Sequence, residues 1–322
     1  MEKQVLDLIV VGGGPAGLVC GIEAEKAGLN YLILEKGLLV NSIYNFPTNM
    51  TFFSTSKKLE IGGVPFISHT EKPTRKEALE YYRRITLSMK LNIKYREKVE
   101  KIKKQKDHFK ILTKESNYQS KYVIIATGFY DHPRLLNIPG EDLLKVKHYY
   151  DDAHPYLGRK VLVVGSRNSA CDVALETWRQ GAEVTMVIRA PQLYEKVKYW
   201  IRPNIENRIK EGSIKVYFNS NLTEITETKV KIQTADGLVE LENDHVLAMT
   251  GYHPDYEFFK KIGFDIQPKD LKPIVNEHLE SSIQGLYLAG VIISGLNTSE
   301  LFIENTRDHG AIIIADLNRK GW

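Results

Sequence analysis

A glycine-rich turn close to the start of the chain constrains its fold more than any other feature. Residues Leu6–Val11 are mostly apolar and β-branched, as in a buried parallel strand, and GGGPAG follows at residues 12–17. A helical pattern then runs from Leu18 to Ala27, and a second apolar strand, Tyr31–Leu34, ends in Glu35. In this pattern Gly12 makes the tight turn, Gly14 lets the backbone approach a pyrophosphate, and Gly17 lets the helix pack on the strand. The helix N-terminus attracts phosphates and Glu35 suits ribose hydroxyls, so the sequence predicts a dinucleotide site.

The same unit recurs later in the chain. Val161–Val164 predicts a strand, GSRNSA at residues 165–170 forms the turn, and a helix leads to a further strand, Val184–Ile188. Where the first unit has its acid, this one has Ile188, followed by Arg189. Because an acid there would repel a 2′-phosphate and a guanidinium would attract it, the second unit favours NADPH over NADH. Arg167 adds a second candidate phosphate contact; the alternative for Arg189 is a solvated strand end.

Two further segments complete this pattern. Tyr122–Gly128 is an apolar strand that ends in a turn of small residues, and Gly285–Gly290 is another. A helix is expected from about Ser299 to Ala315, with Asn297 as its cap and Glu300 completing a capping box. Strands alternating with helices in this way indicate an α/β fold.

Length and charge bound the class of protein. The 322 residues are enough for two domains, and the net charge of +4 is modest. The basic cluster at Lys101, Lys103, Lys104 and Lys106 is expected to be a solvated hairpin or loop rather than a nucleic-acid site. No apolar run approaches about 18 residues and the start leads straight into a strand, so neither a membrane span nor a signal peptide is expected. Two distant cysteines give no disulfide framework or metal cluster, which fits a reducing cytoplasm.

The order of these motifs resembles that of the thioredoxin-reductase-like flavoproteins. Four longer strings are similar to the bacillithiol-disulfide reductase family within that group: residues 41–47, 52–66, 148–156 and 302–310. The resemblance covers essentially the whole chain. It implies two Rossmann-like, doubly wound nucleotide-binding domains: an FAD domain of residues 1–130 and 250–322, and an inserted NADPH domain of residues 131–249. The crossings near 129–133 and 250–254 would form a hinge.

The resemblance further implies an FAD-dependent NADPH oxidoreductase, in which a helix N-terminus after Asn297 points at the flavin. Glu304 and Asn305 would lie near the flavin pyrimidine, although Glu304 is equally well explained as a helix-surface charge. Asn41 and Asn45 would approach the flavin, or else form local Asx turns. No catalytic residue and no metal ligand is assigned. The expected cofactor contacts are Gly12, Gly14, Pro15, Ala16, Gly17, Glu35, Lys36, Asn41, Asn45, Val99, Ala126, Thr127, Gly128, Gly290, Val291 and Glu304 for FAD, and Gly165, Arg167, Asn168, Ser169 and Arg189 for NADPH.

The departures from the family concern thiols. Thioredoxin reductases carry CxxC shortly before the second fingerprint, where this chain has His148 and Asp151. The bacillithiol family is thought to use a cysteine in the first glycine motif, where this chain has Ala16. Cys20 lies one helical turn further on; we expect it to be packed against the sheet, the alternative being a relocated redox thiol, and Cys171 is interpreted in the same way. Val291 replaces an aspartate that contacts the ribityl chain in most relatives, although the bacillithiol family also lacks that acid.

The sequence is compatible with more than one electron acceptor. One hypothesis is a low-molecular-weight disulfide such as bacillithiol disulfide. Another is a small redox protein, ferredoxin or flavodoxin, and a third is a non-catalytic, flavin-dependent NADPH sensor. A homodimer or higher homo-oligomer is expected, with no nucleic-acid or membrane partner.

Overall fold

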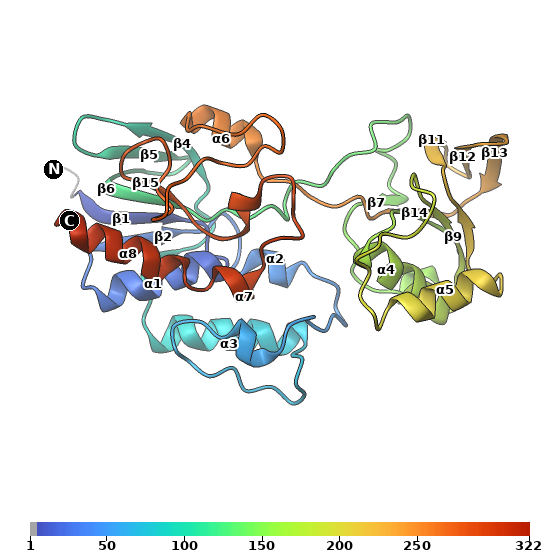
Figure 1. The fold of residues 1–322 in the computed structure, drawn as a ribbon, viewed down its shortest axis with the longest axis horizontal. Helices are drawn as coiled ribbons and strands as arrows, with labels where there is room; N and C mark the ends of the chain where they lie inside the picture. Colours follow the sequence, from blue (N-terminus) through green and yellow to red (C-terminus); the bar gives the residue numbers. More distant parts are fainter. Residues whose placement is uncertain (1–4) are drawn as a thin grey trace. The chain divides into compact units, whose positions relative to one another are not determined.

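The computed structural model describes residues 5–322; residues 1–4, which the predicted FAD domain includes, lie outside the described residues. The chain divides into two compact units (Figure 1). The first unit contains the chain up to residue 45, residues 49–132 and residues 252–322, and the second contains residues 46–48 and 133–251. Among the described residues, no helix is long and apolar enough to cross a membrane.

The first unit is built on a seven-stranded sheet in which β1 is central. β1 pairs in parallel with β2 on one side and with β6 on the other, and β6 continues in parallel to β15. An antiparallel hairpin, β4–β5, extends this sheet and carries the lysine cluster on exposed positions, which confirms the predicted solvated hairpin. The strands are β1 (Leu6–Val11), β2 (Tyr31–Leu34), β3 (Ile93–Lys94), β4 (Val99–Lys104), β5 (Phe109–Thr113), β6 (Asn117–Ile125) and β15 (Leu286–Leu288).

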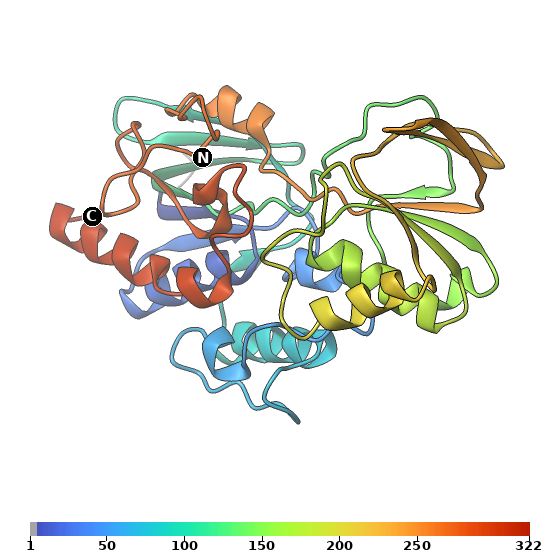
Figure 2. The same cartoon turned by 45° about the vertical axis from the view of Figure 1, so that its right-hand side comes forward.

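Two helices far apart in the sequence, α1 and α8, run side by side on one face of this sheet (Figures 1 and 2). Their close approach depends on Gly310, since a Cβ there would lie 2.7 Å from a methyl carbon of Val19. Phe258 and Phe259 of α6 pack with residues of β4 and β5 in a core cluster. The helical segments are α1 (Pro15–Lys26), α2 (Asn41–Tyr44), η1 (Ser56–Leu59), α3 (Arg75–Ser88), α6 (Tyr256–Ile262), η3 (Gly290–Ser294), α7 (Ile303–Thr306) and α8 (His309–Lys320).

The helix expected from about Ser299 to Ala315 is wrong in its start and in its continuity. It begins at Ile303 and is divided into α7 and α8. Asn297 does not cap it, because its side-chain amide bonds to the Glu300 carboxylate. The cap comes from Asn305, whose side-chain oxygen accepts the Phe302 amide at 2.7 Å.

The second unit holds a five-stranded parallel sheet between two different layers. Val161 and Val163 of β8 face the helices α4 and α5, whereas Leu162 and Val164 face a three-stranded antiparallel sheet, β11–β13 (Figure 2). Both faces of β8 are therefore buried, which explains its continuous apolar sequence. The elements are β7 (Val146–Lys147), η2 (His154–Tyr156), β8 (Lys160–Val164), α4 (Asn168–Arg179), β9 (Glu183–Val187), α5 (Arg202–Lys210), β10 (Lys215–Tyr217), β11 (Asn221–Ile225), β12 (Lys229–Thr234), β13 (Gly237–Glu242) and β14 (His245–Ala248).

Candidate functional site

The first glycine motif forms a tight turn between β1 and α1. Gly12 has a φ of +115°, and a Cβ there would lie 2.4 Å from the carbonyl oxygen of Ala126. A Cβ on Gly17 would lie 1.8 Å from the carbonyl oxygen of Gly12. The turn is thus closed from two sides by backbone, and the small-residue turn after β6, residues 126–128, lies directly against it.

The same turn leaves room for a phosphate group. Apart from residues 13–15 themselves, no described residue has an atom within 4 Å of a Cβ built on Gly14, the residue that precedes the first turn of α1. The amides of Ala16 and Gly17 have no acceptor within the helix, as in any first helical turn. Nearby, the buried hydroxyl oxygen of Thr127 has no hydrogen-bond partner among residues 5–322. Open space, first-turn amides and a buried hydroxyl fit the pyrophosphate of a dinucleotide.

Glu35 closes this site at the end of β2. Its carboxylate accepts the Gly13 amide at 2.6 Å and the Gly37 amide at 2.7 Å. Burial raises the pKa of Glu35, although these two amide hydrogen bonds act in the opposite direction. The acid is therefore fixed against the glycine turn by backbone donors.

A third segment, at the end of β15, reaches the first turn of α1. Gly290 has a φ of +81°, and a Cβ there would lie 2.7 Å from the Cβ of Ala16. The Gly290 amide donates to Nδ1 of His309 at 3.0 Å. Burial lowers the pKa of His309, so the ring is neutral and accepts this bond. No sequence motif links His309 to Gly290, which lies 19 residues earlier in the chain. Val291 follows in η3.

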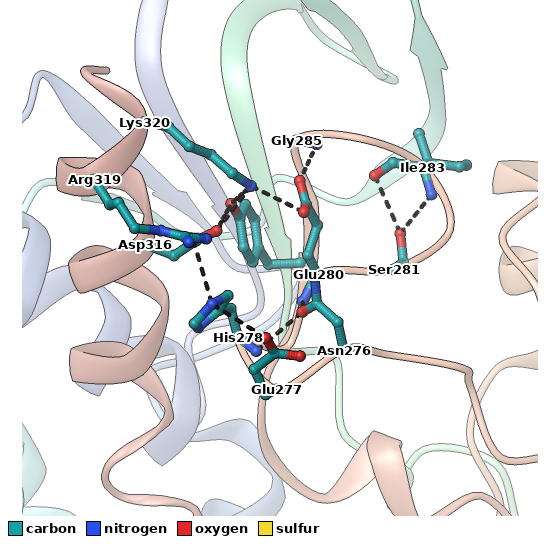
Figure 3. A network of polar contacts seen from close by, with 11 residues as sticks. Asn276, Glu277, His278, Glu280, Ser281, Ile283, Gly285, Asp316, Arg319 and Lys320 are labelled. Atoms are coloured by element: carbon teal, nitrogen blue, oxygen red, sulfur yellow. Dashed lines mark hydrogen bonds and ion pairs between the residues drawn. The ribbon is translucent and has the colours of Figure 1, made fainter.

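The opposite ends of β15 and α8 are joined by an ionic network around the buried carboxylate of Asp316 (Figure 3). The Tyr287 hydroxyl donates to Asp316 at 2.7 Å, and the Lys320 ammonium lies 2.8 Å from the same carboxylate. Burial alone would raise the pKa of Asp316, but hydrogen bonds from Lys320, Tyr287 and Arg319 outweigh it and hold that pKa well below its usual range. With the Gly290–His309 bond, β15 and α8 are cross-linked at two points.

Several other expected flavin contacts make local interactions. The side-chain oxygen of Asn41 accepts the Leu38 amide at 3.3 Å, and the Asn45 side chain donates to the Asn41 carbonyl at 2.8 Å. Both bonds are local, but neither is the Asx turn of the alternative interpretation, in which the side-chain oxygen accepts the amide two residues further on. Other positions are engaged elsewhere in the first unit: Lys36 pairs with Asp131 at 2.9 Å, Glu304 lies 3.8 Å from Lys58, and Val99 is part of the hydrophobic core.

Both cysteines are buried. The side chain of Cys20 has no exposed surface, and burial raises its pKa to about 12. Cys171 is equally inaccessible, and burial raises its pKa to about 12 as well. The prediction that both pack in the interior is confirmed, and neither thiol is ionised at neutral pH.

The second glycine motif forms the same kind of tight turn as the first, but an alanine stands at the place of its last glycine. A Cβ on Gly165 would lie 2.6 Å from the carbonyl oxygen of Met249, the counterpart of the contact between Gly12 and Ala126. Ala170 stands where the first motif has Gly17, and Ser169 is exposed in the first turn of α4. Arg189 follows β9 and is exposed, whereas Ile188, at the place of the acid, is buried.

His148, at one of the positions where thioredoxin reductases carry cysteine, has a structural partner. Its Nε2 lies 3.2 Å from a carboxylate oxygen of Glu141. Glu141 in turn accepts the amides of Leu136 and Asn137 at 2.5 and 2.6 Å. The pair fixes a turn within the second unit.

Two nucleotide fingerprints in one chain define an oxidoreductase that uses two dinucleotides. The family model of the pyridine nucleotide-disulphide oxidoreductases matches residues 9–290. Bacilliredoxin reductase Bdr of Bacillus subtilis (strain 168) is 44% identical over 315 residues, 97% of each chain. A solved bacillithiol disulfide reductase Bdr (YpdA) from Staphylococcus aureus superimposes with a TM-score of 0.95 at 41% identity, covering 99% of this chain and 100% of the other. A ferredoxin–NADP reductase of Ignicoccus hospitalis is 28% identical, over 89% of this chain and 90% of the other.

The chain therefore belongs to the pyridine nucleotide-disulphide oxidoreductase family. It has the predicted fold of two Rossmann-like domains and is an FAD-dependent NADPH oxidoreductase. FAD and NADPH are its cofactors, as predicted.

Proposed function

We propose that residues 1–130 and 250–322 form the FAD domain and that residues 131–249 form the NADPH domain. The open space at Gly14, the first-turn amides of α1 and the unpartnered hydroxyl of Thr127 support FAD binding at the first motif. Arg167 and Arg189 at the second motif support NADPH there, because guanidinium groups bind a phosphomonoester in a planar, two-pronged manner. The segments at 129–133 and 250–254 are proposed as the hinge.

Bound FAD would supply the hydride and electron-transfer chemistry between NADPH and the acceptor. The residues of this chain bind and orient it. The α1 amides would hold the pyrophosphate, and the Glu35 carboxylate would accept hydrogen bonds from ribose hydroxyls. The bond from Gly290 to neutral His309 keeps the turn after β15 pressed against Ala16.

The acceptor we propose is a low-molecular-weight disulfide such as bacillithiol disulfide. The observation that carries this proposal is the 44% identity, over 97% of each chain, with a relative named bacilliredoxin reductase. In this chain the disulfide would be reduced without a thiolate relay. Ala16 has no sulfur, and Cys20 is buried with a pKa raised to about 12.

A second candidate acceptor is ferredoxin or flavodoxin. The same absence of an accessible thiol at positions 16 and 20 favours it, because a one-electron protein acceptor requires no mixed disulfide. The 28% identical relative named ferredoxin–NADP reductase is consistent with this choice.

Anaerobic NADPH consumption by the purified yellow protein tests these alternatives. Bacillithiol disulfide, a ferredoxin, a flavodoxin and ferricyanide would be compared at equal concentrations. Turnover with the disulfide above the rate without acceptor supports the first proposal, and turnover only with the proteins supports the second. Flavin that is not reduced by NADPH would contradict both.

We also propose a cytoplasmic homo-oligomer, which light scattering and cell fractionation would test.

A further inference from the structure

The segment between β9 and α5, residues 190–201, is fastened to the second glycine motif on both sides of Arg167. The Tyr194 amide donates to the carbonyl of Ser166 at 3.1 Å. The Lys198 amide donates to the side-chain oxygen of Asn168 at 2.9 Å. Leu193, Val197 and Ile201 are buried in the core of the second unit and anchor the segment from below. The segment is thus an ordered part of the nucleotide motif rather than a free loop.

Tyr194 faces the guanidinium of Arg167 from this segment. The guanidinium carbon lies 4.5 Å from the centre of the tyrosine ring, within the range of a cation–π contact. Arg167 itself is exposed and occupies the position of the middle glycine, where the first motif leaves open space at Gly14. An exposed arginine without support samples many rotamers, and ordering it on binding costs conformational entropy. Stacking on one face restricts it while the in-plane N–H groups stay available for an oxyanion.

Arg202 holds the tyrosine in place. Its guanidinium donates to the Tyr194 carbonyl at 2.7 Å and to the Glu195 carbonyl at 3.0 Å. A further hydrogen bond at 2.8 Å to Glu206 fixes Arg202 along the first turn of α5. The backbone of Tyr194 is therefore fixed at its amide and its carbonyl, and its partly buried side chain packs against the core of the second unit, which restricts the ring.

We propose that Tyr194 is a positioning residue that holds the Arg167 guanidinium ready for the phosphomonoester on the adenosine ribose of NADPH. Together with Arg189 at the end of β9, this pair selects NADPH over NADH. The inference rests on the proposed function, in which the second unit binds NADPH. It adds Tyr194, which does not touch the nucleotide but orients Arg167, the residue that does.

Binding of adenosine 2′,5′-bisphosphate and of 5′-AMP to the FAD-loaded enzyme, measured by calorimetry at fixed ionic strength, tests this role. Tyr194→Ala should weaken the bisphosphate by about three- to tenfold, the loss expected for one cation–π contact at a partly exposed site, and leave 5′-AMP unchanged. Tyr194→Phe keeps the ring and should stay within about twofold of the wild type. Tyr199→Ala is the matched control, because Tyr199 lies in the same segment and is 80% exposed.

Two further measurements separate positioning from a general loss of structure. Tyr194→Leu keeps an apolar side chain at this position but has no π face, so it should weaken binding of the bisphosphate as much as Tyr194→Ala does. On an Arg167→Ala background, loss of the ring should cost no further affinity, because the two residues act as one unit. In turnover, KM for NADPH should rise by the same factor as the dissociation constant while kcat stays constant.

The inference is overturned if Tyr194→Ala and Tyr194→Leu bind the bisphosphate as tightly as the wild type. It is also overturned if the leucine variant weakens 5′-AMP equally, since the ring would then support the whole motif. A wild-type enzyme that binds the two nucleotides equally would instead refute the proposed preference of the second unit for NADPH, which is a distinguishable failure.

Discussion

Replacing Ala16 by cysteine should give this enzyme the thiolate relay that it lacks. Position 16 lies in the first turn of α1, half-exposed, beside the side-chain-free Gly290. A thiol placed there is stabilised as thiolate by the first-turn amides and the helix dipole. We therefore expect Ala16→Cys to raise activity toward bacillithiol disulfide.

The size of the effect follows from the thiolate populations. Burial raises the pKa of Cys20 to about 12. At pH 7 only about one Cys20 side chain in 10⁵ is then ionised. A cysteine at a helix N-terminus has a pKa of about 3.5–7.5, so roughly a quarter or more of it is thiolate at pH 7. The new thiolate is thus more abundant by a factor of about 10⁴, and even with its lower nucleophilicity we expect at least a tenfold rise in kcat/KM for the disulfide.

The assay is NADPH consumption with bacillithiol disulfide and with ferricyanide, for the wild type, Ala16→Cys and Cys20→Ser. We expect wild-type activity with ferricyanide to exceed that with the disulfide, because the flavin does not need a thiol to reduce ferricyanide. Mass spectrometry after alkylation at pH 7 should label position 16 in the variant and leave Cys20 unlabelled. Cys20→Ser should keep both activities within a few-fold, with a stability loss of about 1–3 kcal/mol for a buried hydroxyl.

Rapid wild-type turnover of the disulfide, unchanged by Ala16→Cys, would refute this reasoning and indicate direct disulfide reduction that needs no thiol. Loss of disulfide turnover in Cys20→Ser would also refute it, because Cys20 would then have a role in the reaction. In that case Cys20 would have to become exposed during the catalytic cycle.

Three other substitutions test separate parts of the structure. Arg189→Ala should remove most of the preference for NADPH, since a charge-assisted contact contributes about 1.5–3 kcal/mol, or about 10–150-fold; equal KM values for NADPH and NADH in the wild type would contradict this. Gly17→Ala places a Cβ 1.8 Å from the Gly12 carbonyl oxygen, so it should destabilise the first unit by about 3 kcal/mol or more and release FAD on gel filtration. The matched change Ala170→Gly should cost only about 1 kcal/mol, and an equal loss in both variants would be evidence against the packing argument. Asp316→Asn removes the buried carboxylate that binds Tyr287 and Lys320 and should cost about 1.5–3 kcal/mol at pH 7, the contribution of a hydrogen bond to a charged group. Because the folded-state pKa of Asp316 is depressed, its contribution is complete above the unfolded pKa of about 4 and is lost as the pH falls through the folded value. Urea midpoints of wild type and variant should therefore converge in acid, and a constant gap between pH 7 and pH 2 would disprove the assignment.

The amino-acid sequence by itself determined the local architecture of both nucleotide motifs. Strand, glycine turn, helix and strand are set by contacts between residues close along the chain, so β1, α1 and β2 begin or end within a few residues of the predicted positions. The burial of Cys20 and Cys171 was also predictable, because free cysteines are among the most buried residue types and each lies in the helix that follows its glycine turn.

Only the tertiary structure decided which side chains meet. The start of α7 at Ile303 is set by Asn305, whose side chain accepts the Phe302 amide, instead of by the capping box predicted at Asn297, and a propensity argument does not rank the two. The contacts of His309 with Gly290 and of Arg167 with Tyr194 join residues about 20 to 30 positions apart, which the packing of whole elements brings together. A sequence pattern specifies the period and ends of an element, whereas the partner of an exposed arginine or a buried histidine is set by how the finished elements pack.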